Sequence, residues 1–198
     1  MMRVGLTGGV ASGKSTVSAI LVDLGAVLID ADLLAREVVA RGTPGLDAVV
    51  AEFGAELLTG DGDLDRAAMG ALVFADADAR RRLEAIVHPL DFERIVELES
   101  QAPEDAVVVH DIPLLAESGR ADTFDAVLVV HAPAAVQIDR MMRDRGWSRA
   151  EAEARIAAQA SGEERLAVAT HVIDNTGSPD DLRRRVEAVY ASLHDAAA

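Results

Sequence analysis

Cysteine is absent from this chain of 198 residues, and its absence removes several kinds of chemistry at once. Without a thiol the chain has no disulfide, no thiolate ligand for zinc and no cysteine nucleophile. Apolar runs long enough to cross a bilayer are also missing. The apolar start of the chain meets glycine by Gly8 and lacks the features of a secretory signal. We therefore expect a cytoplasmic protein with no membrane partner.

Positive charge is also scarce, since the formal net charge is −15. Nucleic acids are bound by basic faces, so this balance argues against nucleic acid as a partner, although it does not exclude a basic pocket. Lys14 is the one lysine among the 19 lysine and arginine residues. Lysine is a compact cation and arginine a wide planar fork, so we expect position 14 to need the slimmer group.

Short apolar runs alternate with helical patterns along the chain. Its length and its 50% hydrophobic content allow one sizeable core and a small appended region. The runs predicted as strands are Val4–Thr7, Val27–Ile29, Ala106–Val109, Ala126–Val130 and Val172–Ile173. They are apolar throughout, as strands covered on both faces are. Strands alternating with helices predict an α/β fold with a doubly wound, five-stranded parallel sheet.

Several helices can be predicted from spacing and capping patterns in the sequence. Val17, Ile20, Leu21 and Leu24 recur at helical spacing after the first strand. Ser148-x-x-Glu151 predicts a capping box, and Ser178 precedes Pro179 at a first helical position. Residues 36–101 hold helical patterns, two glycine-rich turns and no clear strand. A parallel crossover needs only about a dozen residues, so we interpret this stretch as a helical insertion with its own role.

The strongest motif is Gly8-x-x-x-x-Gly13-Lys14-Ser15, which lies between a predicted strand and a predicted helix. We call residues 8–15 the phosphate loop, because such a turn forms a nest of backbone N–H groups for phosphate oxygens. The next helix presents its free N–H groups and positive dipole end to the same anion. The lysine reaches the β- and γ-phosphates, and the serine hydroxyl ligates Mg²⁺. The residues expected to bind ATP here are Gly8, Gly9, Ala11, Ser12, Gly13, Lys14, Ser15 and Thr16.

The class of phosphate-loop protein can be narrowed by elimination. A GTPase would carry an N-K-x-D element, but the one lysine already lies in the phosphate loop. A motor or an AAA-type ATPase would need a longer chain. A small-molecule kinase needs an acid near the acceptor hydroxyl, an acid that supports Mg²⁺ and mobile arginines, and each has candidates here.

The acidic candidates follow predicted strands. Asp30 and Asp32 come at the end of the second strand, where ligands bind in open α/β sheets. Strand alternation would aim both side chains the same way, so one could act as the base and the other as support. The alternative is that Asp32 caps a helix beginning at Leu33. Asp111 ends the third strand in the manner of an acid that supports Mg²⁺, although an aspartate after an apolar strand is common.

Arginines cluster further along, at Arg140, Arg143 and Arg145, with Arg155 in the next helix. Two helices around the break at Gly146 would form a lid that brings cations onto the phosphoryl group and excludes water. The alternative is a solvated basic helix end. The single domain, residues 1–198, then consists of a nucleotide core (about 1–35, 102–135 and 160–198), the insertion (about 36–101) and the lid (about 136–159).

Several further elements resemble the dephospho-CoA kinase family over nearly the whole chain. They are Asp30-Ala31-Asp32, Leu83–Pro89, Asp111–Leu115, Glu117-Ser118, Gln137 with Arg140, Arg155–Gln159 and Ile173–Asn175. The His88-Pro89 and Asp111-x-Pro113-Leu114-Leu115 elements belong to this family and not to kinases in general. Ala11 stands where the family usually has glycine, and Asp144 where it has a second lid arginine.

The resemblance implies a nucleotide core, a helical CoA-binding region and a lid. It implies that ATP and Mg²⁺ are used and that Asp32 is the base for the ribose 3′-hydroxyl. It assigns Arg140 and Asn175 to the ATP side, and Arg36, His88, Pro89 and Leu114 with Asp32 to the acceptor. Lys14 and Arg140 join Asp32 as catalytic residues, and Ser15 and Asp111 support the metal. We expect a monomer that acts on dephospho-CoA.

Two other functions stay open. The chain could be a different small-molecule kinase, acting on a nucleoside monophosphate, shikimate or gluconate. It could also be a non-catalytic module that senses nucleotides by changing shape.

Overall fold

The computed structural model describes residues 1–197, so the last residue of the predicted core segment 160–198 lies outside the described part. The chain forms two compact units. The first contains Met1–Ile29 and the chain from Ala102 onward, and the second contains Asp30–Gln101. Within the described residues, no helix is both long and apolar enough to cross a bilayer.

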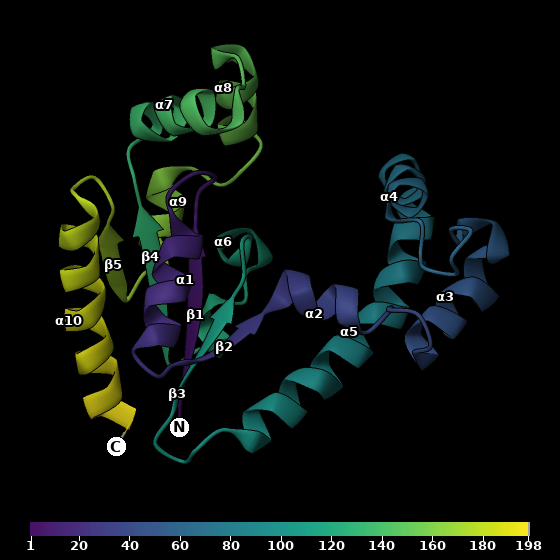
Figure 1. Cartoon of the computed structure of the whole chain (residues 1–198), viewed down its shortest axis with the longest axis horizontal. Coiled ribbons are helices and arrows are strands. Elements are labelled where there is room, and N and C mark those ends of the chain that lie inside the picture. The colour runs from purple at the N-terminus through teal and green to yellow at the C-terminus, as the bar shows by residue number, and fades with distance from the viewer. Residues whose placement is uncertain (198) are drawn as a thin grey trace. The chain divides into compact units, whose positions relative to one another are not determined.

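A five-stranded sheet forms the centre of the first unit (Figure 1). Its strands are β1 (Met2–Gly8), β2 (Val27–Asp30), β3 (Val107–Asp111), β4 (Ala126–His131) and β5 (His171–Asp174). They lie in the order β2-β3-β1-β4-β5. β1 pairs in parallel with β3 and with β4, and β4 pairs in parallel with β5. The predicted parallel sheet is therefore confirmed, and each predicted strand is present within two residues at either end.

Helices cover both faces of this sheet. Successive strand residues point to opposite sides, so the apolar strands present side chains that must be buried on each face. Leu128 and Val130 of β4 pack in one cluster with α1 (Lys14–Asp23) and α10 (Pro179–Ala197). Val127 and Val129 pack on the other side, with Leu115. That side carries α6 (Leu115–Ser118), η2 (Ala121–Thr123) and α9 (Gly162–Ala167). The doubly wound arrangement predicted from the sequence is thus observed.

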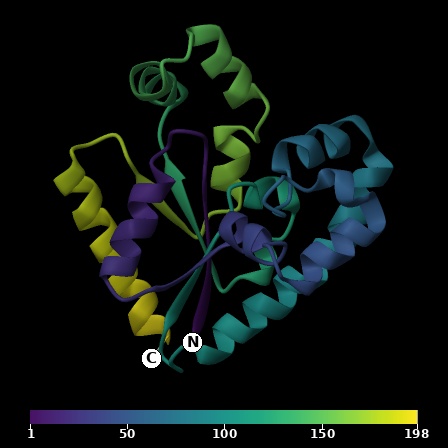
Figure 2. The same ribbon diagram turned by 45° about the vertical axis from the view of Figure 1, so that its right-hand side comes forward.

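Two helices follow β4 and make up the region predicted as a lid. They are α7 (Ala134–Arg145) and α8 (Arg149–Ala157), drawn in green beyond the end of β4 in Figure 2. Gly146 separates them in a left-handed conformation, and Ser148 and Glu151 form the predicted capping box. Their apolar cluster includes Val10 and Ala11 of the phosphate loop.

The second unit is helical, as predicted for residues 36–101. Its elements are α2 (Ala31–Glu37), α3 (Pro44–Phe53), η1 (Ala55–Leu57), α4 (Arg66–Ala75) and α5 (Ala77–Gln101). Its core is built on Val39, Val49, Leu57 and Met69, against which apolar residues of α5 pack. The unit has one isolated bridge, between Leu58 and Leu64. It therefore has a hydrophobic core of its own.

Candidate active site

The phosphate loop connects β1 to α1. Gly13 is the N-cap of α1 and has φ 93°, a left-handed conformation that glycine adopts without strain. A β-carbon at Gly13 would also collide with the side-chain amide of Asn175. The N–H groups of the first turn of a helix have no partner inside it, and the positive dipole end adds to their attraction for an anion. The loop therefore presents Lys14 and Ser15 beside a site suited to phosphate.

Ala11 has φ 56° and is the one non-glycine residue with positive φ among residues 1–197. Such a conformation costs an alanine about 1–2 kcal/mol. The structure adds a conformational reason for the glycine that is usual in the family pattern.

Lys14 and Asp111 form an ion pair at the end of the loop. Lys14 Nζ contacts Asp111 Oδ1, and the Lys14 side chain is 19% exposed. Ser18 Oγ donates to the other carboxylate oxygen of Asp111 at 2.8 Å. Sequence reasoning missed Ser18, although it lies one helical turn after Lys14 and so on the same face of α1. The structure thus brings the phosphate-loop lysine and the β3 aspartate together, a contact that sequence reasoning did not predict.

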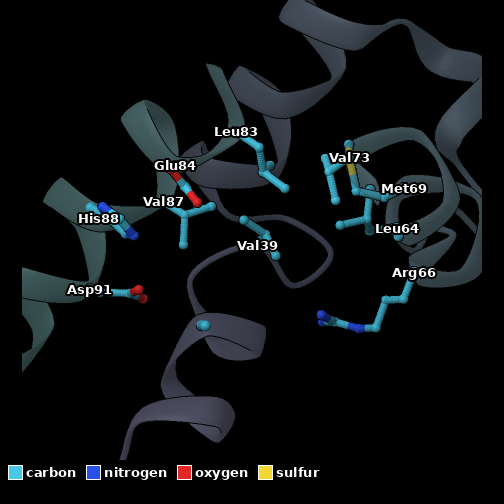
Figure 3. A pocket seen from close by; sticks show the side chains of 12 residues that line it. Val39, Leu64, Arg66, Met69, Val73, Leu83, Glu84, Val87, His88 and Asp91 are labelled. Atoms are coloured by element: carbon cyan, nitrogen blue, oxygen red, sulfur yellow. The ribbon is translucent and has the colours of Figure 1, made fainter. Parts of the chain in front are cut away.

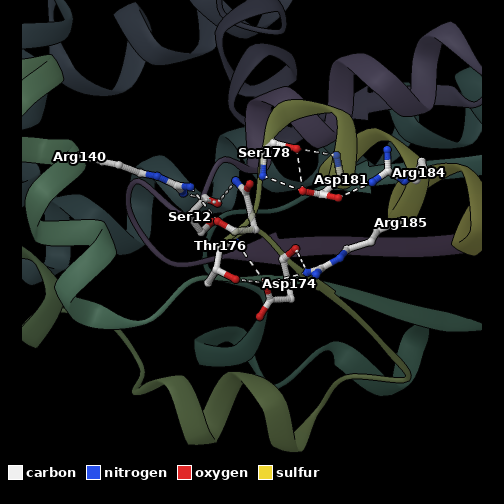
Figure 4. Close-up of polar contacts among 9 residues, drawn as sticks. Ser12, Arg140, Asp174, Thr176, Ser178, Asp181, Arg184 and Arg185 are labelled. Carbon is white, nitrogen blue, oxygen red and sulfur yellow. Dashed lines mark hydrogen bonds and ion pairs between the residues drawn. The ribbon is translucent and has the colours of Figure 1, made fainter.

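Arg140 reaches the phosphate loop from α7 (Figure 4). Its Nη1 donates to the carbonyl oxygens of Ala11 and Ser12, both at 3.2 Å, and its Nη2 donates to Asn175 O at 2.7 Å. The side-chain amide of Asn175 in turn donates to Ser12 O at 2.7 Å. Two residues far apart in sequence, both assigned to the ATP side, therefore meet at the loop.

The other candidate lid arginines lie elsewhere. Arg143 pairs with its neighbour Asp144, which lowers the pKa of that carboxyl through a hydrogen bond. Arg145 lies over the Trp147 ring at 5.3 Å, and Arg155 is exposed. Of the four candidates, the structure places Arg140 alone at the phosphate loop.

The two aspartates after β2 do not play equivalent structural parts. β2 ends at Asp30, and the Asp30 side chain accepts a 2.9 Å hydrogen bond from Leu33 N as the N-cap of α2. Asp32 lies in the first turn of that helix and is exposed. The prediction that Asp32 caps a helix from Leu33 is wrong, and so is the prediction that strand alternation aims both side chains alike. The helix begins two residues earlier than expected, so Asp30 supplies the cap.

A cavity of about 330 Å³ lies within the second unit (Figure 3). It is lined by Ala35, Val39, Leu64, Arg66, Met69, Gly70, Val73, Leu83, Glu84, Val87, His88 and Asp91. Burial raises the pKa of the Asp91 carboxyl, and the nearby His88 opposes that rise. The cavity is thus mainly apolar, with a few polar groups from α4 and α5, as ligand pockets often are.

The residues predicted to bind the acceptor are only partly gathered there. All four of Asp32, Arg36, His88 and Pro89 are exposed, and of these His88 alone lines the cavity. Leu114 belongs to the first unit and is 52% exposed. His88 and Pro89 lie in the middle of α5, which continues through the proline to Gln101.

Comparison with known proteins gives the family. The model of the Dephospho-CoA kinase family matches residues 2–181. The chain belongs to the dephospho-CoA kinase family. A dephospho-CoA kinase of Streptomyces avermitilis is 56% identical over 98% of this chain and 94% of its own length. One of Thermobifida fusca is 51% identical over 98% and 96%.

Solved structures agree with this membership of the dephospho-CoA kinase family. A dephospho-CoA kinase from Campylobacter jejuni is 28% identical, covers 98% of both chains and superposes with a TM-score of 0.72. A shikimate kinase from Acinetobacter baumannii has a TM-score of 0.54 at 17% identity. That second likeness shows the fold alone.

Proposed function

We propose that this chain transfers the γ-phosphoryl group of ATP to the ribose 3′-hydroxyl of dephospho-CoA, giving CoA and ADP. The observation that carries the proposal is the family match over almost the whole chain. The geometry supports it, because the Lys14–Asp111 pair and Arg140 converge on a phosphate loop closed by Gly13. Phosphoryl transfer depends mostly on positioning and charge stabilisation, and these groups supply both.

The nucleotide would bind along the phosphate loop. Backbone N–H groups at the start of α1 donate to phosphate oxygens, and Lys14 supplies a compact positive charge for the β- and γ-phosphates. Arg140 already donates to two loop carbonyls, so it fixes the loop and brings a second cation beside it. Gly8, Gly9, Ser12, Thr16 and Asn175 complete the proposed nucleotide site.

The residues at the loop fit a magnesium ion by their chemistry. Mg²⁺ prefers oxygen ligands and is usually bound through one or two carboxylates and the substrate phosphates. Ser15 offers a hydroxyl and Asp111 a buried carboxylate whose oxygens each retain a free lone pair for a further contact. When bound, the ion would neutralise charge on the phosphates.

Asp32 is proposed as the base that takes the proton from the acceptor hydroxyl. Asp30 is committed to capping α2, whereas the Asp32 carboxylate makes no cap. A general base contributes about 10²–10⁴-fold, and the lower half of that range suits phosphoryl transfer. Arg36, His88, Pro89 and Leu114 stay predictions as acceptor-binding residues, and the cavity beside His88 supports its assignment.

The remaining assignments rest on the sequence. Cytoplasmic location, a monomeric state and the lack of nucleic-acid or membrane partners stay predictions. The acidic composition supports the prediction about nucleic acid.

An acceptor panel tests the proposal. Purified protein with ATP and Mg²⁺ is given dephospho-CoA, a nucleoside monophosphate, shikimate or gluconate, and ADP release is measured. We expect dephospho-CoA to be turned over fastest and CoA to appear in step with ADP. Faster turnover of another acceptor would overturn the substrate assignment. ATP binding without acceptor-dependent ADP release would instead favour the nucleotide-sensing alternative.

A further inference from the structure

The junction between α8 and α9 is held from two sides at one residue, Ala160. Ala160 N donates to Glu117 Oε1 at 2.7 Å, and Ala160 O accepts a hydrogen bond from Arg165 Nη1. Ser161 then begins α9 as its N-cap, in a capping box with Glu164. Side chains from α6 and α9 therefore fix the backbone where the chain leaves α8.

This junction touches the phosphate loop directly. Gln159 Oε1 accepts a 2.9 Å hydrogen bond from Val10 N, a residue 149 positions earlier in the chain. Arg165 approaches the neighbouring loop residue, since a β-carbon at Gly9 would lie 2.7 Å from Arg165 Nη2. Gln137 Nε2 would lie at the same distance from that carbon. The ends of both side chains therefore lie directly against the loop backbone at Gly9.

Arg165 is only 6% exposed, which is unusual for an arginine. A buried cation is costly unless it is paired. Burial lowers the pKa of the Arg165 guanidinium, and the carboxylates of Glu117 and Glu164 oppose that shift. Among residues 1–197 its hydrogen bond is to Ala160 O, which leaves Nη2 facing Gly9. The burial of this cation beside Gly9 points to a structural role at the loop.

We propose that Gln159 and Arg165 are positioning residues for the phosphate loop. Glu117 and Arg165 hold the two peptide groups that flank Ala160. The backbone fixed in this way presents Gln159 to Val10 and so fixes the first half of the loop for phosphate binding. Arg140 and Asn175 hold the second half, through Ala11 and Ser12. The first half of the loop is in this way anchored by the segment that follows α8, and the second half by α7 and by the residue after β5. The inference rests on the nucleotide-binding part of the proposed function and not on the identity of the acceptor.

Nucleotide binding without any acceptor tests this inference. ADP affinity is measured by calorimetry for the wild type, Gln159→Ala, Arg165→Met and the double variant, with melting temperatures recorded alongside. A hydrogen bond of this kind corresponds to about 3- to 10-fold in affinity, and we expect each single variant to lose that much. Because both residues act through the same short segment around Ala160, the double variant should lose less than the product of the single losses. Arg165→Lys keeps a charge and a donor, so it should recover part of the affinity.

Two further variants separate positioning from general stability. Gln159→Glu is nearly isosteric but brings a negative charge to the loop, so it should weaken ADP binding more than Gln159→Ala. Arg184→Met removes an exposed arginine of α10 and should leave ADP affinity at the wild-type value. Unchanged affinity in folded Gln159→Ala and Arg165→Met, or fully multiplicative losses, would overturn the proposal. If the wild type does not turn over dephospho-CoA but the variants show these effects on ADP binding, the result would count against the proposed function alone.

Discussion

At the scale of single residues, Lys14 carries the sharpest expectation. Its compact ammonium lies between the phosphate loop and Asp111, and its side chain is mostly buried. Lys14→Arg keeps the charge but brings a planar fork that is too wide for a space bounded by backbone. We expect the variant to lose at least about tenfold in kcat/KM for ATP, because the guanidinium cannot make the contact that the ammonium makes with the phosphates. Arg184→Lys, an exchange of cations on the exposed face of α10, is the matched control. Near-normal turnover of Lys14→Arg would show that the site does not require the slimmer cation.

Asp30 and Asp32 give a second expectation at this scale, because the structure assigns them different tasks. Asp30→Ala removes the N-cap of α2 and should lower the free energy of unfolding by about 1 kcal/mol. Asp32→Asn should leave the stability unchanged while kcat falls about 10²–10³-fold, with ATP affinity retained. We would measure denaturant unfolding, kcat and ATP affinity for both variants to test whether Asp30 acts as the cap and Asp32 as the base. A wild-type kcat in Asp32→Asn would remove Asp32 from the mechanism.

At the scale of elements, α5 places a carboxyl in an apolar cavity. Burial raises the pKa of Asp91 in the folded state, so this group favours folding below its unfolded pKa and loses that contribution as the pH rises through its folded pKa. We therefore expect Asp91→Asn to be more stable than the wild type at pH 7, with a difference that shrinks as the pH falls toward 4. Glu93→Gln, at an exposed position on the same helix, serves as the control. Parallel stability curves for Asp91→Asn and the wild type would contradict the assignment.

Elements also show how far sequence reasoning extends. The strands were predictable because buried parallel strands are continuously apolar, and the capping box at Ser148 located α8. The start of α2 was not predictable, because aspartate is a favoured N-cap and the chain has one at both Asp30 and Asp32. The position where β2 ends decides between them. The course of α5 runs against local preference, since proline usually ends or kinks a helix.

At the scale of the whole molecule, the charge balance predicts a dependence on salt. A net charge of −15 destabilises the compact state through self-repulsion. Raising NaCl from about 0.01 M to about 0.15 M shortens the Debye length from about 30 Å to about 8 Å. We expect the melting temperature to rise over this range, as measured by scanning calorimetry. A Tm that is constant or falls would show that favourable ion pairs outweigh the repulsion.

Part of the candidate site could be predicted from the sequence, and part becomes visible only in the folded chain. The phosphate loop could be found because its residues are contiguous and each has a stated chemical part. The contacts of Gln159 with Val10 and of Arg165 with Gly9 could not be predicted, because each joins segments about 150 residues apart. Nothing local distinguishes a buried arginine on a short helix from an exposed one.

The Lys14–Asp111 pair has a practical consequence for chemical labelling. Apart from the N-terminal amine, the chain offers acylating reagents one primary amine, and that amine lies in the phosphate loop. A single added mass at Lys14 would therefore report directly on the nucleotide site, and bound ATP should slow its appearance. Reductive methylation, often used to aid crystallisation, would modify the same side chain. Surface coupling through amines would either use the N-terminus or inactivate the protein.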